Sequence, residues 1–369
     1  MRSVIVLLSV SLACGTDDDG DETDVTPDDA RGSSRASNAA SGDAPGGPAL
    51  ITVDAGVSPA AGAYAERAPL LAANSEMAVT AAGGKIYVLG GYPATRDVQT
   101  TVQVYDPAED AWRLAAPMPL PTHHPVAVGI GDRIYSLGGQ LEGDVETARA
   151  FVLDSVADVW TELAPLPTAR GGGAGVAIGE LIYVVGGRPP AANAFEVYDV
   201  GANSWTALPE LPTAFNQRNH LTAAAIGGRV YVAGGRYDGG GFGSPMTDSL
   251  DVYDPTSAVW SSARPMLRPR GGVNGVLALG CFHVWGGEGS NIGEPNDVFP
   301  DHDVYDPVSD TWTSVAPLPV PIHGVTGGVF LDGLIYMPGG GTASGGNSGS
   351  VIHQVYRVDL SCDARPDPR

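Results

Sequence analysis

Short apolar runs that end in a pair of glycines recur along the chain from about residue 61 to residue 365. Each run holds about five residues, which is the length of a strand and not that of a helix. Successive pairs stand 48 to 53 residues apart, and polar or turn-forming segments separate them. The spacing therefore predicts six units of β-structure. The pairs are Gly90-Gly91, Gly138-Gly139, Gly186-Gly187, Gly234-Gly235, Gly286-Gly287 and Gly339-Gly340.

Each unit contains three further strand signals. A run of small apolar residues, such as 174–178, precedes the strand that ends in Gly-Gly. After the glycine pair come a loop and a strand that ends in aspartate, often followed by proline, and Asp-Pro is typical of the first two positions of a type I turn. A tryptophan then opens a fourth strand. These tryptophans are Trp112, Trp160, Trp205, Trp260 and Trp312.

The sixth unit lacks a tryptophan strand, and a matching segment stands ahead of the first unit. Residues 63–71 align with a tryptophan strand, and Tyr64 stands near the tryptophan position. We therefore expect this N-terminal strand to complete the sixth sheet. Such a closure pairs the two ends of the fold and removes open sheet edges.

Four strands in a period near 50 residues, with a double glycine and a Tyr/Trp pair, resemble the kelch repeat of β-propellers. The resemblance implies an all-β fold, a six-bladed kelch β-propeller whose last blade is closed by an N-terminal strand. The aromatic pair would fill the space between neighbouring blades, and small residues would fit near the crowded axis. The propeller domain is expected to span residues 61–369.

The first sixty residues differ from the rest in composition. Residues 1–14 hold a basic start and an apolar run of ten residues, which suits a signal peptide and is too short to span a bilayer. The segment ends in Ser-Leu-Ala-Cys-Gly and resembles a bacterial lipoprotein signal, although Leu12 stands two places before the cysteine instead of three. This resemblance implies acylation of Cys14; an ordinary secretion signal is the alternative. Residues 15–60 are rich in Asp, Ser, Gly and Pro and predict a disordered tether.

The balance of acidic and basic residues limits the kinds of partner that the protein is expected to bind. The chain has 42 acidic and 20 basic residues, a formal net charge of −22, which argues against a nucleic-acid partner. Lys85 is the only lysine, so the basic side chains are almost all arginines, and most of them lie within the repeats. The acidic excess includes the tether, so it does not exclude an anionic small ligand in the propeller.

Basic and polar residues recur at two positions of the repeat that belong to one face of a four-stranded blade. We name the six residues that stand sixteen places before each glycine pair the leading residues, and the six that stand two places after its start the trailing residues. We expect both sets to surround the channel mouth, where arginine suits carboxylate, sulfate or phosphate. The alternative is a structural role, in which these arginines pair with acids or cap carbonyls. The leading residues are Asn74, Thr122, Arg170, Arg218, Arg270 and His323. The trailing residues are Tyr92, Gln140, Arg188, Arg236, Glu288 and Gly341.

The candidate ligand-binding residues are taken from these sets and from the adjacent histidines. The loops after the glycine pairs of units four to six are long and rich in Gly, Asn, Asp and Ser, as recognition loops often are. No metal site is assigned, because the histidines near the mouth belong to different blades. The candidates are Arg170, Arg218, Arg270, His323, Arg188, Arg236, His123 and Asn74.

Two cysteines and one acid–base pair complete the candidate chemistry. In an oxidising compartment Cys281 and Cys362 could form a disulfide, and two unpaired thiols are the alternative. Glu288 facing Arg270 or His323 would offer weak candidates for acid–base catalysis. Sialic-acid mutarotases and galactose oxidases also contain kelch propellers, but no motif beyond the repeat supports either activity, and no cofactor is assigned.

The sequence thus favours a binding module over an enzyme. We expect an exported protein of a bacterial cell envelope, in the outer membrane or periplasm, attached to the membrane only through a lipid. Its partner would be a polar or anionic small molecule, a glycan or an envelope protein, bound by a monomer at one channel mouth. A carbohydrate-active enzyme of the kelch type is the alternative.

Overall fold

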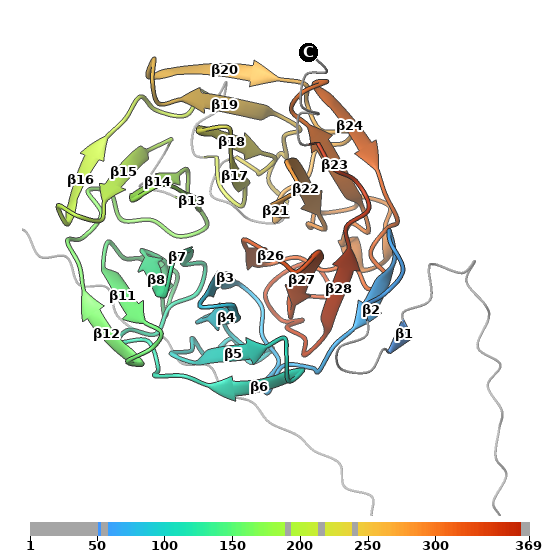
Figure 1. Cartoon of the computed structure of the whole chain (residues 1–369), viewed down its shortest axis with the longest axis horizontal. Helices are drawn as coiled ribbons and strands as arrows, with labels where there is room; N and C mark the ends of the chain where they lie inside the picture. The colour runs from blue at the N-terminus through green and yellow to red at the C-terminus, as the bar shows by residue number, and fades with distance from the viewer. Residues whose placement is uncertain (1–50, 53–57, 189–192, 213–217, 238–242, 363–369) are drawn as a thin grey trace, which may run out of the picture. The chain divides into compact units, whose positions relative to one another are not determined.

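The computed structural model describes residues 51–52, 58–188, 193–212, 218–237 and 243–362. These residues form six four-stranded antiparallel blades arranged around a central axis, with the first strand of each blade innermost (Figure 1). The expected six-bladed, all-β propeller is therefore confirmed. Among the described residues, no helix combines the length and apolar character needed to cross a membrane. Cys14 and nearly all of the expected tether lie outside the described residues.

Blades one to three follow the predicted order of a small-residue strand, the strand that ends in Gly-Gly, the strand that ends in Asp and the tryptophan strand. Blade one contains β3 (Met77–Ala82), β4 (Lys85–Leu89), β5 (Val102–Asp106) and β6 (Ala111–Leu114). Blade two contains β7 (Val126–Ile130), β8 (Arg133–Leu137), β11 (Ala150–Asp154) and β12 (Val159–Glu162), with a hairpin of β9 (Gln140–Leu141) and β10 (Val145–Glu146) in its loop. Blade three contains β13 (Ala174–Ile178), β14 (Leu181–Val185), β15 (Phe195–Asp199) and β16 (Ser204–Ala207).

Blades four and five keep this order, and blade six combines both ends of the fold. Blade four contains β17 (Thr222–Ile226), β18 (Arg229–Ala233), β19 (Leu250–Asp254) and β20 (Val259–Ala263). Blade five contains β21 (Asn274–Ala278), β22 (Cys281–Trp285), β23 (His302–Asp306) and β24 (Thr311–Ser314), with the short 3-10 helix η2 (Pro295–Asp297) in its loop. Blade six contains β26 (Val329–Leu331), β27 (Leu334–Pro338), β28 (His353–Arg357) and β2 (Tyr64–Glu66).

The N-terminal strand closes blade six as the repeat pattern predicts. Tyr64 pairs with Tyr356 in the β2–β28 ladder, as Trp112 pairs with Tyr105 in blade one, so Tyr64 takes the tryptophan position. Besides the β9–β10 hairpin, two short strands were not expected. β1 (Ile51–Thr52), inside the segment assigned to the tether, pairs in parallel with β2, and β25 (Val325–Thr326) pairs in parallel with β3. The sheet thus extends further toward the N-terminus than composition suggested, and the last blade is joined to the first near the axis.

The tryptophans link each blade to the one before it. In all five fourth-strand tryptophans the indole Nε1 donates a hydrogen bond to a backbone carbonyl of the preceding blade's fourth strand or the segment after it, as in Trp160 to Ala116 at 2.9 Å and Trp312 to Arg264 at 2.8 Å. In blades one, three, four and five the ring also packs on the tyrosine of its own blade, with centroids 5.2 Å apart for Tyr305 and Trp312, and in blade two Trp160 pairs with Leu153 instead. The indole therefore fills the space between sheets, as expected, and its only donor is satisfied.

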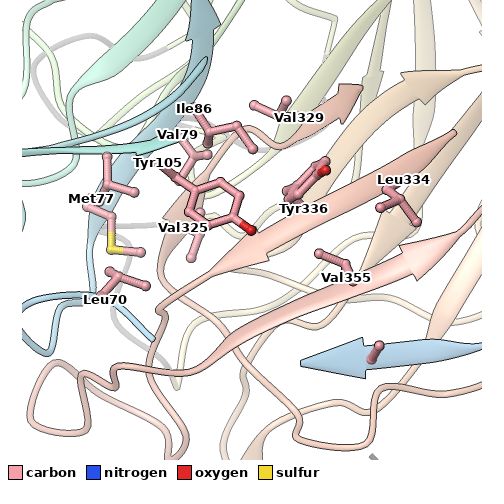
Figure 2. Packing of buried hydrophobic residues seen from close by; sticks show 12 residues of the cluster. Leu70, Met77, Val79, Ile86, Tyr105, Val325, Val329, Leu334, Tyr336 and Val355 are labelled. Atoms are coloured by element: carbon pink, nitrogen blue, oxygen red, sulfur yellow. The ribbon is translucent and has the colours of Figure 1, made fainter. Parts of the chain in front are cut away.

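Hydrophobic packing between the last and the first blade completes the ring. Figure 2 shows Tyr336 and Leu334 of blade six packed with Tyr105 and Val79 of blade one, and all four side chains are buried. Burying an aliphatic or aromatic side chain stabilises a fold by roughly 1.5–3 kcal/mol relative to leaving it exposed. The junction between the chain ends is therefore built like the other blade interfaces.

A disulfide joins the end of blade six to blade five. Cys281 starts β22 and is fully buried, and its sulfur is bonded to that of Cys362, with a Cα–Cα distance of 5.0 Å. The backbone N–H of Cys362 also donates a hydrogen bond of 2.8 Å to the carbonyl of Leu279. Of the two alternatives that the sequence left open, the structure contains the disulfide.

Candidate functional site

The leading arginines of blades three, four and five point into their own blades and away from the channel mouth. Each guanidinium is fully buried and forms an ion pair with the second residue of the third strand. Arg270, for example, donates to Asp303 at 2.6 Å and to the backbone carbonyls of Gly286 and Asp301. This geometry is that of the structural alternative, because the charges are satisfied inside the protein. The other two pairs are Arg170–Glu196 and Arg218–Asp251.

Blade six differs from the predicted register by one residue. In the other blades the N–H of the second glycine of each pair bonds to the carbonyl of the next leading residue, as Gly91 does with Thr122. The corresponding partner of Gly287 is Ile322 and not His323. The inner strand of blade six is broken at residues 327–328 between β25 and β26, which adds one residue to the count. His323 therefore takes the position after the leading position, one residue further along the chain toward the axis than the position that Arg270 holds in blade five.

Six residues surround the axis, and we name them the axial ring. Each lies two places after the leading residue of its blade, with Ile322 taking the leading position in blade six. They all have positive φ, between 52° and 69°. Backbone hydrogen bonds join neighbours from blade to blade, as from His124 N to Glu76 O at 2.6 Å and from His220 N to Gly172 O at 2.7 Å. The ring is therefore a structural belt that requires a left-handed backbone. Its members are Glu76, His124, Gly172, His220, Gly272 and Gly324.

Three members of the axial ring are not glycines, although glycine suits this backbone best. Glu76, His124 and His220 each adopt the left-handed conformation at a cost of roughly 1–2 kcal/mol. Backbone strain of this kind is concentrated at functional sites. The leading and trailing positions considered in the sequence do not include Glu76. Alignment of the repeats two places beyond the leading residues, where units three and five have Gly172 and Gly272, is the signal that would have found it.

The three strained side chains meet one another at the axis. Glu76 Oε2 lies 2.7 Å from His124 Nε2, and His124 Nε2 lies 3.1 Å from His220 Nε2. All three side chains are buried. The same residues, with the ring glycines, line a cavity of about 10 Å³, which is roughly the space of one water-sized occupant. Histidines of different blades therefore do meet, because the ring positions converge on one point.

The trailing residues form a second layer over the axial ring. Arg236 donates to Glu288 Oε1 at 2.7 Å, and the other oxygen of Glu288 lies 3.5 Å from His323 Nδ1. The loop of blade six crosses above them, since the backbone N–H of Gly345 donates to Glu288 Oε2 at 2.6 Å. The structure thus brings Glu288 to His323, as one of the two expected pairings requires, but not to Arg270. Glu288, Arg236 and His323 are buried under this loop.

The remaining candidates lie around these two layers. His123 is buried, with its Nδ1 2.6 Å from Nδ1 of His124 and its Nε2 3.3 Å from the carbonyl of Leu141. Asn74 is also buried and donates from Nδ2 to the carbonyl of Gly90 at 2.7 Å. Arg188 is partly exposed, and its guanidinium lies 3.3 Å from His220 Nε2. Arg188 is therefore the candidate arginine that both approaches the axis and retains contact with solvent.

Burial sets the protonation of the axial groups. It lowers the pKa of His123 to about 3, and it also lowers the pKa values of His124 and His220, so neutral imidazoles are favoured at pH 7. Burial raises the pKa of Glu76, but the attraction of His124 and His323 outweighs it and leaves the pKa below the ordinary value. Glu288 follows the same pattern, with His323 and Arg236 as the groups that lower its pKa. The site therefore combines carboxylates with neutral imidazoles.

The repeat architecture and this mouth define a kelch-type propeller, and sequence comparison agrees. The family described as the KLHDC2/KLHL20/DRC7 kelch-repeats domain matches residues 123–341, and the kelch motif family matches residues 73–119. Because the first match covers more than half of the chain, the chain belongs to the kelch-repeat family.

Curated relatives share the repeats over part of their length. The chain is 32% identical over 167 residues to the kelch-like protein terF of Aspergillus terreus, a match that covers 45% of this chain and 34% of that protein. It is 32% identical over 152 residues to beta-scruin of Limulus polyphemus, covering 40% of this chain and 16% of that protein. It is 29% identical over 176 residues to human kelch-like protein 34, covering 44% of this chain and 25% of that protein. The chain thus spans about a third or less of these relatives.

Proposed function

We propose that this protein is an exported, lipid-anchored kelch propeller that binds a polar or anionic ligand, or an envelope partner, at the axial mouth of its loop face. Family membership supports the general role, because kelch propellers commonly serve as interaction modules. The observation that carries the proposal is the meeting of ionisable side chains from several blades under the loops of this mouth. Groups of this kind are the usual means of orienting a polar ligand.

The two faces of the propeller differ in a way that favours this mouth. The first two strands of each blade are joined on the opposite face by tight turns, such as Gly83–Gly84 with φ of 55° and 72°. On the loop face, longer connections carry exposed short polar side chains, including Asn291, Asn296 and Asn347. Loops on a rigid β-scaffold commonly carry recognition. Arg188 is partly exposed on that face, and its guanidinium reaches the axis at 3.3 Å from His220 Nε2.

The disulfide supports export. Structural disulfides persist in oxidising compartments such as the periplasm and are rare in reducing ones, and Cys281 and Cys362 are joined in this fold. The lipid anchor is proposed from Cys14 and the signal-like segment around it. Together the two arguments support localisation in the cell envelope of a bacterium.

A carbohydrate-active enzyme is the second candidate, and one contact favours it. Glu288 and His323 lie 3.5 Å apart beneath the loop of blade six, and Ser344 donates to the same carboxylate at 3.1 Å. A carboxylate beside an imidazole can exchange protons with a sugar hydroxyl. In this reading the mouth would catalyse anomerisation of an acidic sugar such as sialic acid.

One experiment separates these functions. The full chain and its Cys14→Ser variant are expressed in a bacterium, and we expect the wild type in the membrane fraction and the variant in the soluble fraction. The purified wild type is then applied to a glycan array with sialylated and uronic sugars, and to detergent-solubilised envelope proteins. Ligands found there are titrated against Arg188→Ala and against Arg133→Ala, a matched arginine on the turn face.

Binding should weaken about tenfold or more in Arg188→Ala and stay unchanged in Arg133→Ala. Equal binding by wild type, Arg188→Ala and Arg133→Ala would contradict the proposed mouth. Anomerisation of sialic acid that is lost in Glu288→Gln would replace the binding module by the enzyme. An identical distribution of wild type and Cys14→Ser between the fractions would remove the lipid anchor from the proposal.

A further inference from the structure

The contacts around His124 require more protons than neutral rings can supply. Three contacts follow one another: Glu76 Oε2 to His124 Nε2 at 2.7 Å, His124 Nδ1 to His123 Nδ1 at 2.6 Å, and His123 Nε2 to the Leu141 carbonyl at 3.3 Å. Each contact joins two acceptor atoms unless a proton lies between them. Two neutral imidazoles carry two N–H protons, so one of the three contacts has no proton between its two acceptor atoms.

Both ends of this row of contacts are acceptors, so the tautomer of His124 decides which end lacks its proton. The carbonyl of Leu141 and the carboxylate of Asp144, 3.5 Å from His123 Nε2, accept hydrogen bonds and cannot donate them. If His123 is protonated on Nε2, its Nδ1 accepts from Nδ1–H of His124. The Nε2 lone pair of His124 is then directed at the carboxylate of Glu76. This is the tautomer that a metal-bound histidine adopts when its second nitrogen donates a hydrogen bond.

His220 presents its own ring in the same way. Its Nδ1 lies 2.6 Å from the side-chain oxygen of Asn219, which accepts the proton and leaves a lone pair on Nε2. The Nε2 atoms of His220 and His124 are only 3.1 Å apart. Ligand atoms bonded to one ion at about 2.1 Å lie about 3.0–3.4 Å from each other at octahedral or tetrahedral angles. The two lone pairs are thus spaced as they would be on a shared ion.

We propose that the axial ring binds one divalent transition-metal ion through Glu76, His124 and His220. A carboxylate and two imidazoles suit zinc or a similar first-row ion and leave positions open for water or another ligand. The three donor atoms lie within 4.8 Å of one another and border the small cavity at the axis. This inference goes beyond the proposed function, because the ion occupies the ring whether or not a ligand binds above it.

Charges near the ring do not prevent a cation. The guanidiniums of Arg188 and Arg236 oppose it, and the carboxylates of Glu76 and Glu288 offset them. The ion replaces the contact of 3.3 Å between the Arg188 guanidinium and His220 Nε2. A second group, formed by Glu76, Glu288 and His323, also brings three donors within 4.8 Å. Its His323 Nδ1 has no hydrogen-bond partner among the described residues. This group is the competing position for the ion, and the test must distinguish the two.

Glycine substitutions test the metal ligands without disturbing the backbone, because glycine already stands at three positions of the ring. His220→Gly and His124→Gly remove a ligand and relieve a positive φ, so both variants should fold at least as well as the wild type without metal. The full-length protein is stripped with EDTA and titrated with zinc chloride alone by calorimetry, and the bound metal is counted by elemental analysis. Cobalt(II) absorption reports the coordination geometry independently.

We expect one zinc per wild-type chain, and zinc affinity about 100-fold or more weaker in His220→Gly and His124→Gly. His353→Gln, which changes a buried histidine outside the ring, should bind zinc like the wild type. Absence of stoichiometric zinc in the stripped wild type overturns the inference, and so does wild-type affinity in both glycine variants. Loss of zinc in His323→Gln, with retention in His220→Gly, would place the ion at the competing group and also overturn it.

Discussion

Removal of the Cys281–Cys362 disulfide should destabilise the propeller by several kcal/mol. The bond spans a sequence separation of 81 residues and ties the segment after β28 to the start of β22. Cross-linking a loop of that length restricts the unfolded chain, and the chain-entropy relation gives about 4.5 kcal/mol at 25 °C. For a fold of this size, that free energy corresponds to a fall in Tm of about 5–10 °C.

The measurement compares Cys281→Ala/Cys362→Ala with the wild type in a shared Cys14→Ser background, which removes the third cysteine. Urea unfolding, followed by tryptophan fluorescence, gives the free energy of unfolding for the oxidised wild type, the reduced wild type and the double variant. If the cross-link itself is responsible, the reduced wild type and the double variant should agree. Hydrogen exchange should then show its earliest new opening in β28, beside the released segment.

Two results would refute this reasoning. A double variant within about 1 kcal/mol of the oxidised wild type would show that the bond does not limit the unfolded chain. A double variant much less stable than the reduced wild type would assign the loss to the buried Cys281 side chain and not to the bond. In either case, blade six would be held by its strand pairing and packing alone.

Two further predictions concern buried charges and buried histidines. Arg218→Met should lower the free energy of unfolding, measured in urea, by about 3–5 kcal/mol, because it leaves Asp251 buried without its arginine. The double variant Arg218→Met/Asp251→Leu should recover most of this loss. Equal stability of the single and the double variant would contradict the ion-pair explanation. Burial lowers the pKa values of His283 and His353 to about 4, so the unfolded chain binds more protons than the folded one between about pH 6.5 and pH 4. Stability should be complete above that window and fall by roughly 1.4 kcal/mol per pH unit and histidine as the pH drops through it, and a flat profile of unfolding free energy from pH 7 to pH 5 would exclude this linkage.

The sequence was sufficient to predict the blades because their signals are local and repeated. Gly-Gly, Tyr-Asp and Trp recur in register, and Tyr64 replaces Trp at the pairing position opposite Tyr356. The parallel strands β1 and β25 were not predictable in this way. Each has only two residues; β25 pairs with a strand of another blade that is remote in sequence, and β1 is added in parallel to the edge of blade six. Contacts of that kind are decided by tertiary packing and leave no periodicity in the chain.

The sequence also encodes the structural role of the leading arginines. That role can be read only when the leading position is compared together with the second residue of the third strand. Wherever a blade has a leading arginine, the second residue of its third strand is an acid, as in Arg170 with Glu196 and Arg218 with Asp251. Blade one, which leads with Asn74, has Gln103 there instead. Comparing repeats at both positions would have predicted buried ion pairs. Counting arginines on a face could not, because it does not tell whether a side chain turns inward.

The axial ring shows what comparison within a single chain can reveal about function. A left-handed backbone is needed at all six positions, and glycine meets that need at Gly172, Gly272 and Gly324. A purely structural belt would gain stability from glycine at the other three positions as well. Those positions instead hold a carboxylate and two imidazoles, each at a cost of roughly 1–2 kcal/mol and all directed at one point. Something that glycine cannot supply must offset this cost, and coordination of an ion at the axis would do so.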